Sequence, residues 1–270
     1  MVIKRICVAG AGEIGYQIML LLVRCGYEIS VYDINTDALE EVKNKISVDL
    51  ERYMQTKGLP EQIVNPNHKV LFTHNLGIAV DKCDMVIESI PENIEIKKQF
   101  FKNLDEVCDS STILASNSSS MCIGEISSLT KRQDRVIGIH FTRPLELSFC
   151  EIIPSIFTSE STLDTTKYFA RSIGKKYIVI RDSPGQAGRL LLVQINEALK
   201  MIGEGICTDA DINIISKTLL GHKFGLMEIV GFAPELFETG LEYMQQKLGD
   251  YYAPHPLLKQ LRAKRRKAKE

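Results

Sequence analysis

Short apolar runs alternate with amphipathic stretches along most of the chain. Residues 3–9 (IKRICVA) are apolar and β-prone, as in a strand of a parallel sheet that is buried on both faces. Residues 14–24 then place apolar side chains at helical spacing, and Gly26 follows where a helix is expected to end. A second apolar run at residues 29–32 predicts a second buried strand.

The same alternation continues to about residue 182. Further strands and helices are expected in this order: strand 70–72, strand 85–89, helix 94–107, strand 113–115, strand 136–139, helix 163–172 and strand 177–180. Strands that alternate with helices predict an α/β fold, here a doubly wound and mostly parallel sheet in a domain of residues 1–182. The stretch of about 36–68 is too long for a minimal connection, so we interpret it as an inserted helical pair.

The pattern changes after Asp182. Residues 187–204 are amphipathic, and another helix is expected after Thr208, with Asp211 in the position of a capping box. Pro234 opens a third helix that runs to about residue 248. Because no strand pattern returns, we predict that residues 183–270 form a second, smaller, all-helical domain.

Three glycines form a GxGxxG motif between the first strand and the first helix: Gly10, Gly12 and Gly15. The first allows a tight turn, the second lets the backbone approach a pyrophosphate, and the third lets helix and strand pack closely. Asp33 closes the second strand, where its carboxylate accepts hydrogen bonds from ribose hydroxyls and repels a 2′-phosphate. The pattern predicts a Rossmann-type site that favours NAD over NADP. A glycine-rich turn without a ligand and an FAD site remain as alternatives.

Composition makes several classes of partner unlikely. The 270 residues carry 33 Lys and Arg against 34 Asp and Glu, so no overall field favours nucleic acid or an anionic membrane surface. No apolar stretch approaches the roughly 20 residues of a membrane-spanning helix. Seven scattered cysteines without a CxxC pair are typical of reduced thiols in a cytoplasmic protein, and no metal site is expected. We interpret the basic run 262–270 as a solvated helix end, with a nucleic-acid arm as the alternative.

Two further segments carry side chains suited to the oxidation of a hydroxyl group. Residues 116–120 (SNSSS) follow a predicted strand and so belong to the carboxyl edge of the sheet, where ligands bind. His140 follows another strand, and Glu151 comes eleven residues later. A histidine held by a carboxylate takes the proton as hydride leaves, while the carboxylate orients the ring. An ordinary polar loop and a structural histidine are the alternatives.

Together these segments resemble the 3-hydroxyacyl-CoA dehydrogenase family, including its short-chain 3-hydroxybutyryl-CoA members. The resemblance spans nearly the whole chain, through PENIEIKKQFF (91–101), SNSSSMCIGEIS (116–127) and RQDRVIGIHF (132–141) to DSPG and RLLL. It implies NAD-dependent oxidation or reduction in fatty acid metabolism. In this family the inserted helical pair helps to bind coenzyme A, and the helical domain closes the cleft and forms a homodimer.

The resemblance also implies roles for individual residues. Three residues match positions that line the nicotinamide and ribose side of the family's cofactor site: Glu92, Lys97 and Asn117. Ser119 matches the serine that hydrogen-bonds the substrate oxygen. His140 matches the catalytic base, and Glu151 matches the carboxylate that partners it.

Two departures from the family pattern concern the substrate. The family's HFFNP reads HFTRP here, so Arg143 replaces an active-site asparagine, and PGQAGRLLL puts Gly188 where the family has a substrate-contacting asparagine. Loss of such an amide costs about 2–4 kcal/mol of transition-state stabilisation, judged from oxyanion donors. The Arg143 guanidinium suits a substrate carboxylate or phosphate, with a surface salt bridge as the alternative.

Two functions follow from these residues. The first is a dehydrogenase that acts with NAD on a 3-hydroxyacyl thioester, linked to CoA or to a carrier protein, or on a related small hydroxy acid, with His140 as general base. The second is a catalytically impaired family member that binds NAD and acts as a sensor or scaffold, which Gly188 favours. The retained Ser119, His140 and Glu151 favour the first.

Overall fold

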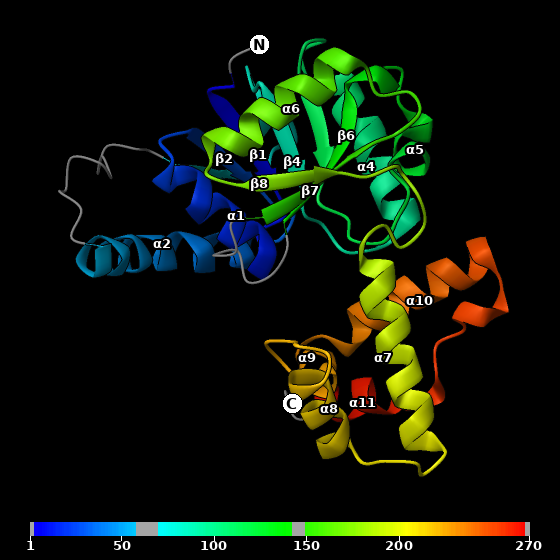
Figure 1. Cartoon of the computed structure of the whole chain (residues 1–270). Coiled ribbons are helices and arrows are strands. Elements are labelled where there is room, and N and C mark those ends of the chain that lie inside the picture. Colours follow the sequence, from blue (N-terminus) through cyan, green and yellow to red (C-terminus); the bar gives the residue numbers. More distant parts are fainter. Residues whose placement is uncertain (1–2, 58–69, 142–148, 268–270) are drawn as a thin grey trace. The chain divides into compact units, whose positions relative to one another are not determined.

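The computed structural model describes residues 3–57, 70–141 and 149–267 (Figure 1). The chain divides into two compact units. The first contains Met1–Ser118 and Ile123–Asp182, and the second contains Ser119–Cys122 and Ser183–Glu270. The four-residue segment Ser119–Cys122 therefore belongs to the second unit, although both of its neighbours in the chain belong to the first.

One eight-stranded sheet organises the first unit, in the order β3-β2-β1-β4-β5-β6-β7-β8. Its strands are β1 (Arg5–Ala9), β2 (Glu28–Tyr32), β3 (Leu71–Thr73), β4 (Met85–Glu88), β5 (Ile113–Ser116), β6 (Val136–Phe141), β7 (Phe149–Pro154) and β8 (Lys176–Val179). Neighbouring strands are parallel except for the antiparallel pair β6 and β7. The strand order reverses between β1 and β4, and doubly wound sheets bind ligands at the carboxyl ends of the strands beside such a switch point.

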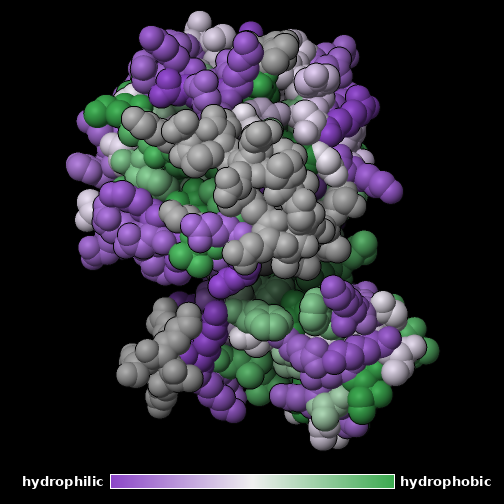
Figure 2. Space-filling model, turned by 90° about the vertical axis from the view of Figure 1, so that its left-hand side faces the viewer, coloured by the Kyte–Doolittle hydropathy of each residue, from purple (hydrophilic) through white to green (hydrophobic). Residues whose placement is uncertain are grey.

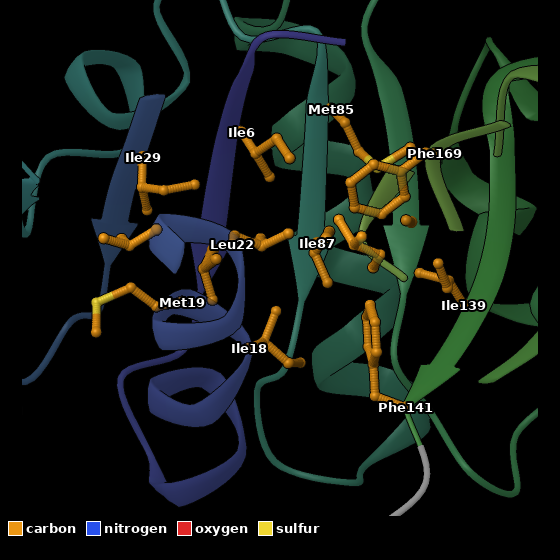
Figure 3. Packing of buried hydrophobic residues seen from close by; sticks show 14 of the residues in the cluster. Ile6, Ile18, Met19, Leu22, Ile29, Met85, Ile87, Ile139, Phe141 and Phe169 are labelled. Carbon is orange, nitrogen blue, oxygen red and sulfur yellow. The ribbon is translucent and has the colours of Figure 1, made fainter. Parts of the chain in front are cut away.

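An apolar core joins this sheet to three helices: α1 (Glu13–Arg24), α2 (Thr36–Lys57) and α6 (Glu160–Ser172). Figure 3 shows Ile18 and Leu22 of α1 and Phe169 of α6 beside strand residues such as Ile6 and Ile87. The unit also contains α3 (Leu76–Val80), α4 (Ile94–Val107) and the short α5 (Ile123–Ile126). Burial of the strand side chains on both faces explains why the strands appear in the sequence as continuous apolar runs.

The second unit is entirely helical in the described residues. Its helices are α7 (Gly188–Gly203), α8 (Asp209–Thr218), α9 (Leu226–Phe232), α10 (Pro234–Leu248) and α11 (Pro256–Lys267), with a short 3-10 turn at Asp250–Tyr252. They enclose their own core, to which Ile195, Leu241 and Leu258 contribute fully buried side chains. Thr208 and Asp211 form the expected capping box at the start of α8.

The structure confirms the predicted α/β fold with its doubly wound, mostly parallel sheet and additional helical unit. Helices α4 and α10 begin and end at the predicted residues. The first strand is shorter than predicted and begins at Arg5. The antiparallel strand β7 was not predicted, and neither were the helices α3, α5, α9 and α11. Of the inserted helical pair, α2 is the first member, and residues 58–69 lie outside the described residues.

The basic run near the end of the chain continues α11 as far as Lys267. Arg262 Nη1 donates to Glu238 Oε2 (2.9 Å), and Arg265 Nη1 donates to Glu235 Oε1 (2.6 Å). These two arginines therefore pair with acids of α10, as expected for a solvated helix end rather than for a basic arm.

All seven cysteines lie within the described residues, and none of them forms a disulfide bond. Among the described helices, none is both long and apolar enough to cross a membrane.

Candidate functional site

The turn between β1 and α1 has the shape that its three glycines permit. Gly10 adopts φ +108°, and a Cβ atom there would lie 2.5 Å from Ser89 O at the end of β4. A Cβ atom on Gly15 would lie 1.8 Å from Gly10 O, so the helix packs directly against the turn. A Cβ atom on Gly12, by contrast, would meet nothing within 4 Å. The fold therefore excludes side chains at Gly10 and Gly15 but leaves open space at Gly12, which is the position where a pyrophosphate approaches the backbone.

Asp33 lies beside this turn. The Ala11 N–H donates to Asp33 Oδ2 (2.7 Å), and the Asn35 N–H donates to Asp33 Oδ1 (2.8 Å). The backbone reinforces the contact, because the Gly10 N–H donates to Tyr32 O (2.7 Å). The acid at the end of β2 is thus held next to the glycine turn, so that one ligand can reach both.

These residues fit the diphosphate and ribose of NAD. Gly12 is the N-cap of α1, and no side chain caps the first amides of this helix. Uncapped amides at a helix N-terminus attract an anion, and the open space at Gly12 lets that anion approach. In folds of this type a carboxylate at the end of the second strand hydrogen-bonds a ribose hydroxyl, and Asp33 occupies that position.

A buried cluster of charges lies at the ends of β4 and β5. Lys97 Nζ donates to Glu88 Oε1 (2.5 Å) and lies 3.2 Å from Glu92 Oε2. The Lys97 side chain is 1% exposed and that of Glu92 is 14% exposed, whereas Glu88 is fully buried. Burial lowers the pKa of Lys97, but the charges and hydrogen bonds of Glu88 and Glu92 outweigh it and raise the pKa above its ordinary value. Lys97 is therefore a buried ammonium group.

The sequence predicted Glu92 and Lys97 as site residues but not Glu88. Glu88 accepts three hydrogen bonds, from Lys97 Nζ, from Ser116 Oγ (2.7 Å) and from the Ile90 N–H (2.9 Å). It thereby joins β4, β5 and α4. The available signal was an acid at the carboxyl end of an apolar strand, with a lysine nine residues later on the next helix.

Asn117 and Ser118 connect this charge cluster to the neighbouring strand. The Asn117 N–H donates to Glu88 O (2.9 Å), and Asn117 Oδ1 accepts from the Phe141 N–H (2.9 Å) at the end of β6. Ser118 Oγ donates to Glu92 Oε1 (2.5 Å). Residues 116–118 therefore tie the ends of β4, β5 and β6 together at one edge of the sheet.

His140 and Glu151 face each other across the antiparallel strands β6 and β7. They are directly paired in the strand register, which brings side chains on one face together. His140 Nδ1 lies 3.3 Å from Glu151 Oε2. The histidine is partly exposed (18%), whereas the carboxylate is buried (6%). A buried carboxylate at Nδ1 leaves Nε2 as the ring nitrogen for proton transfer.

Ser119 and Gly188 both belong to the second unit. A Cβ atom on Gly188 would lie 3.3 Å from Ser119 O, so any side chain there would press against the serine's carbonyl. Two residues before Gly188, Gln186 adopts φ 46° and donates from Nε2 to Met121 O (2.8 Å). The segment that carries Ser119 is therefore held by the residues around Gly188. Arg143 lies outside the described residues.

Asp182 is a second residue whose importance the sequence did not indicate. Its carboxylate accepts hydrogen bonds from the N–H groups of Ile123 and Gly124, both at 2.8 Å. Burial raises the pKa of Asp182 above its usual range, although these two hydrogen bonds oppose the shift. Asp182 thus ties together two of the three points at which the chain passes between the units, at residues 122–123 and 182–183.

Known proteins share this organisation over nearly the whole chain. Residues 5–183 match the NAD binding domain of 3-hydroxyacyl-CoA dehydrogenase, and residues 187–270 match its C-terminal domain. A probable 3-hydroxybutyryl-CoA dehydrogenase of Bacillus subtilis (strain 168) is 34% identical over 267 residues, which cover 96% of this chain and 92% of that protein.

Solved structures agree with this match. The (S)-3-hydroxybutyryl-CoA dehydrogenase of Ralstonia eutropha has a TM-score of 0.86 at 26% identity, with 97% of this chain and 94% of that chain covered. An NAD⁺-dependent dismutase, named as the 5-dehydrogenase of 5-formyl-3-hydroxy-2-methylpyridine 4-carboxylic acid, has a TM-score of 0.73 at 25% identity, with 98% and 95% covered. Because both domains match in order and across almost every residue, the chain belongs to the 3-hydroxyacyl-CoA dehydrogenase family and is an NAD-dependent oxidoreductase.

Proposed function

We propose that the protein oxidises the hydroxyl group of a short-chain 3-hydroxyacyl thioester with NAD, and that His140 is the general base. The contact between His140 and Glu151 is the observation that carries this proposal. Relatives named as 3-hydroxybutyryl-CoA dehydrogenases, among them proteins of Bacillus subtilis and Clostridioides difficile, support the choice of substrate.

The reaction assigns one task to each side chain. His140 removes the proton of the substrate hydroxyl through Nε2, and Glu151 orients the ring and stabilises the imidazolium that forms. Ser119 donates a hydrogen bond to the substrate oxygen. Bound NAD would supply the acceptor for the hydride that leaves the carbon atom bearing this hydroxyl group. In the reverse direction His140 returns the proton.

The cofactor contacts divide between the two sides of the switch point, along the carboxyl ends of the strands. Gly10, Gly12 and Gly15 shape the turn that receives the diphosphate, and Asp33 binds the adenosine ribose. The opposite half of the dinucleotide, with the nicotinamide ring, contacts three residues of the first unit: Glu92, Lys97 and Asn117. The hydrogen bonds of Asn117 to strand ends on either side support this placement.

A carboxylate-bearing hydroxy acid is a second candidate substrate. One structural neighbour is named as the dehydrogenase of a pyridine carboxylic acid, so this fold also serves a substrate with a free carboxylate in that protein. In this chain the guanidinium of Arg143 would pair with such a group. A thioester linked to a carrier protein is the third candidate.

A substrate panel decides among these candidates. NADH formation is measured with 3-hydroxybutyryl-CoA, with longer 3-hydroxyacyl-CoA thioesters, with the same acyl group on a carrier protein, and with free 3-hydroxy acids. We expect the highest kcat/KM with the short CoA thioester. Total inactivity together with tight NAD binding would reject the enzymatic proposal in favour of a sensor or scaffold.

We further propose that the helical unit, residues 183–270, forms a homodimer and contributes to substrate binding. Its surface exposes large apolar side chains on α8, α9 and the adjoining turns: Ile206, Ile214, Leu219, Leu220 and Phe232. Figure 2 shows several hydrophobic areas on this unit. Exposed apolar patches of this kind mark contact surfaces. In sedimentation velocity we expect a dimer for the parent and a monomer for Leu219→Asp, and a monomeric parent would contradict the proposal.

We also propose that the protein works in the cytoplasm, because seven cysteines without a disulfide bond fit a reducing compartment.

A further inference from the structure

A tight turn precedes helix α7. Residues 183–186 read SPGQ, with proline at the second position and glycine at the third, which is the pattern of a type II β-turn. Gly185 adopts φ +77°, as the third position requires, and the Gln186 N–H donates to Ser183 O (3.1 Å). We call these four residues the SPGQ turn. It places Gln186 two residues before Gly188, at the start of the helix.

The SPGQ turn holds the segment Ser119–Cys122, which belongs to the same unit. The Gly185 N–H donates to Ser120 O (2.7 Å), and Gln186 Nε2 donates to Met121 O (2.8 Å). Two consecutive residues of the turn therefore bind two consecutive carbonyl groups of the segment. One of these bonds comes from the backbone and the other from a side chain.

Other residues of the helical unit hold the two ends of this segment. Tyr243 on α10 is 4% exposed, and its hydroxyl accepts a hydrogen bond from the Cys122 N–H (3.1 Å). At the other end, a Cβ atom on Gly188 would lie 3.3 Å from Ser119 O, so the first turn of α7 packs closely against the serine backbone. The main chain around Ser119 is thus fixed along its whole length by one unit.

Gln186 lowers the stability of the fold in two ways. It is 7% exposed and adopts φ 46°, in the left-handed region that favours glycine. Because a carbonyl oxygen only accepts hydrogen bonds, Met121 O must face the amide nitrogen, which leaves Oε1 on the other side of the amide. Within the part of the chain that the structure describes, this buried oxygen has no hydrogen-bond partner. A strained residue with an unsatisfied polar atom is a reason to look for a functional role.

We propose that Gln186 and Tyr243 are positioning residues, which hold Ser119–Cys122 so that the serine hydroxyl is correctly placed for the substrate oxygen. The proposal rests on the role of Ser119 in the proposed function. This chain has Gly188 where the family has a substrate-contacting asparagine, and glycine has no side chain that could orient the substrate. More of that task therefore depends on the position of Ser119, which the two buried side chains fix.

Turnover of 3-hydroxybutyryl-CoA by two single variants tests this role. Gln186→Met keeps the length of the side chain and removes the amide, whereas Tyr243→Phe removes only the hydroxyl group. We expect kcat to fall about 10- to 100-fold in the first and about tenfold in the second, because a small displacement of a catalytic group is costly. The glycine turn and Asp33 lie in the first unit, so the Kd for NAD is expected to stay within about a factor of two.

Stability and a matched variant separate this role from a structural one. Gln186→Met loses one hydrogen bond but also removes the unpartnered Oε1, so its melting temperature is expected to lie close to that of the parent. Gln245→Met is the control, because the exposed Gln245 side chain on α10 donates to Asp250 Oδ1 (3.0 Å) and does not contact the segment. We expect its kcat to equal that of the parent.

A double-mutant cycle with Ser119→Ala shows whether the effect passes through the serine. Ser119→Ala alone is expected to lower kcat about 100-fold and to leave a measurable rate. If Gln186 and Tyr243 act by placing the serine hydroxyl, neither substitution lowers kcat further once that hydroxyl is absent. A structural defect would lower kcat by the same factor in both backgrounds.

Full turnover in either folded variant would overturn the role of that residue, and so would a loss of kcat that persists undiminished in the Ser119→Ala background. If one variant does not fold in thermal unfolding, the other decides by the same criteria. A parent without activity, or Ser119→Ala with the turnover of the parent, would instead reject the proposed function on which both roles rest.

Discussion

The glycine turn and the charge cluster, which consists of Glu88, Glu92 and Lys97, lie at neighbouring strand ends of one sheet. Backbone atoms form the first, and side chains form the second. In the glycine turn the surface is backbone, and Gly10 and Gly15 are needed because a Cβ atom would collide with Ser89 O or Gly10 O. In the charge cluster the surface consists of side chains from β4, from α4 and from the loop between them. The first region is defined by the absence of side chains, the second by buried side chains of opposite charge.

This difference determines how substitutions act on each region. A change in the glycine turn acts through sterics and removes space for the backbone or for the ligand. A change in the charge cluster acts through electrostatics, because each group that is lost leaves another charge buried without its partner. The following predictions separate these two kinds of effect.

The largest effect is expected for Gly15→Ala. Its Cβ atom would lie 1.8 Å from Gly10 O, which is backbone and has no room to move, so helix α1 must separate from the turn. We expect loss of NAD binding and a fall of about 3 kcal/mol or more in the free energy of unfolding. Gly12→Ala is the matched variant: its Cβ atom meets nothing within 4 Å, so the stability is retained while NAD affinity falls. Equal melting temperatures for both variants would contradict this account.

Lys97→Ala is expected to have the next largest effect on stability. Removal of the ammonium leaves Glu88 buried without its partner, which costs about 3–5 kcal/mol. Urea unfolding of the ligand-free protein measures this loss. The double variant Glu88→Gln/Lys97→Gln is expected to be clearly more stable than Lys97→Ala. If Lys97→Ala were as stable as the parent, the cluster would not be a buried ion network.

Asp33→Ala is expected to act on the nucleotide more than on the fold. Loss of a charged hydrogen-bond acceptor for the ribose is worth about 1.5–3 kcal/mol, or roughly a tenfold to hundredfold loss of NAD affinity. The preference for NAD over NADP is expected to fall as well, because the carboxylate no longer repels a 2′-phosphate. Titrations with both nucleotides check this. An unchanged preference would contradict the role of Asp33.

Thr208→Ala is expected to have the smallest effect and tests a region outside both sites. Thr208 and Asp211 cap α8 in the helical unit, and loss of such a cap costs about 1 kcal/mol. The melting temperature is expected to fall while NAD affinity stays at the parent value. A parallel loss of NAD affinity would mean that global stability, and not the local site, controls binding in the other variants.

The same comparison explains what the sequence alone can predict. The glycine turn depends on residues close together in the chain, so GxGxxG and Asp33 predicted a turn geometry that the structure has. The helix α4 was predicted with the right ends because Asn93 caps it and its apolar residues follow one period. In the charge cluster, Glu92 and Lys97 were predicted from the family resemblance but Glu88 was not, and the hydrogen bond that Glu88 accepts from Ser116 joins residues 28 positions apart. No local pattern connects these two residues.

Two other differences have similar causes. Strand β7 was not predicted, because its six residues form a short apolar run that periodicity alone does not distinguish from part of a helix. Its antiparallel direction is what places Glu151 opposite His140. Helix α9 is short and helix α11 is highly charged, so the apolar spacing of both is a weak signal. Burial against the other helices of the unit stabilises them.

The most direct test of the account is the turnover of 3-hydroxybutyryl-CoA by the parent and by His140→Ala, with the Kd for NAD measured on the same preparations. If His140 is the general base, kcat falls by about 10²- to 10⁴-fold while the Kd for NAD stays within about a factor of two. Equal turnover of the two proteins would contradict the central claim.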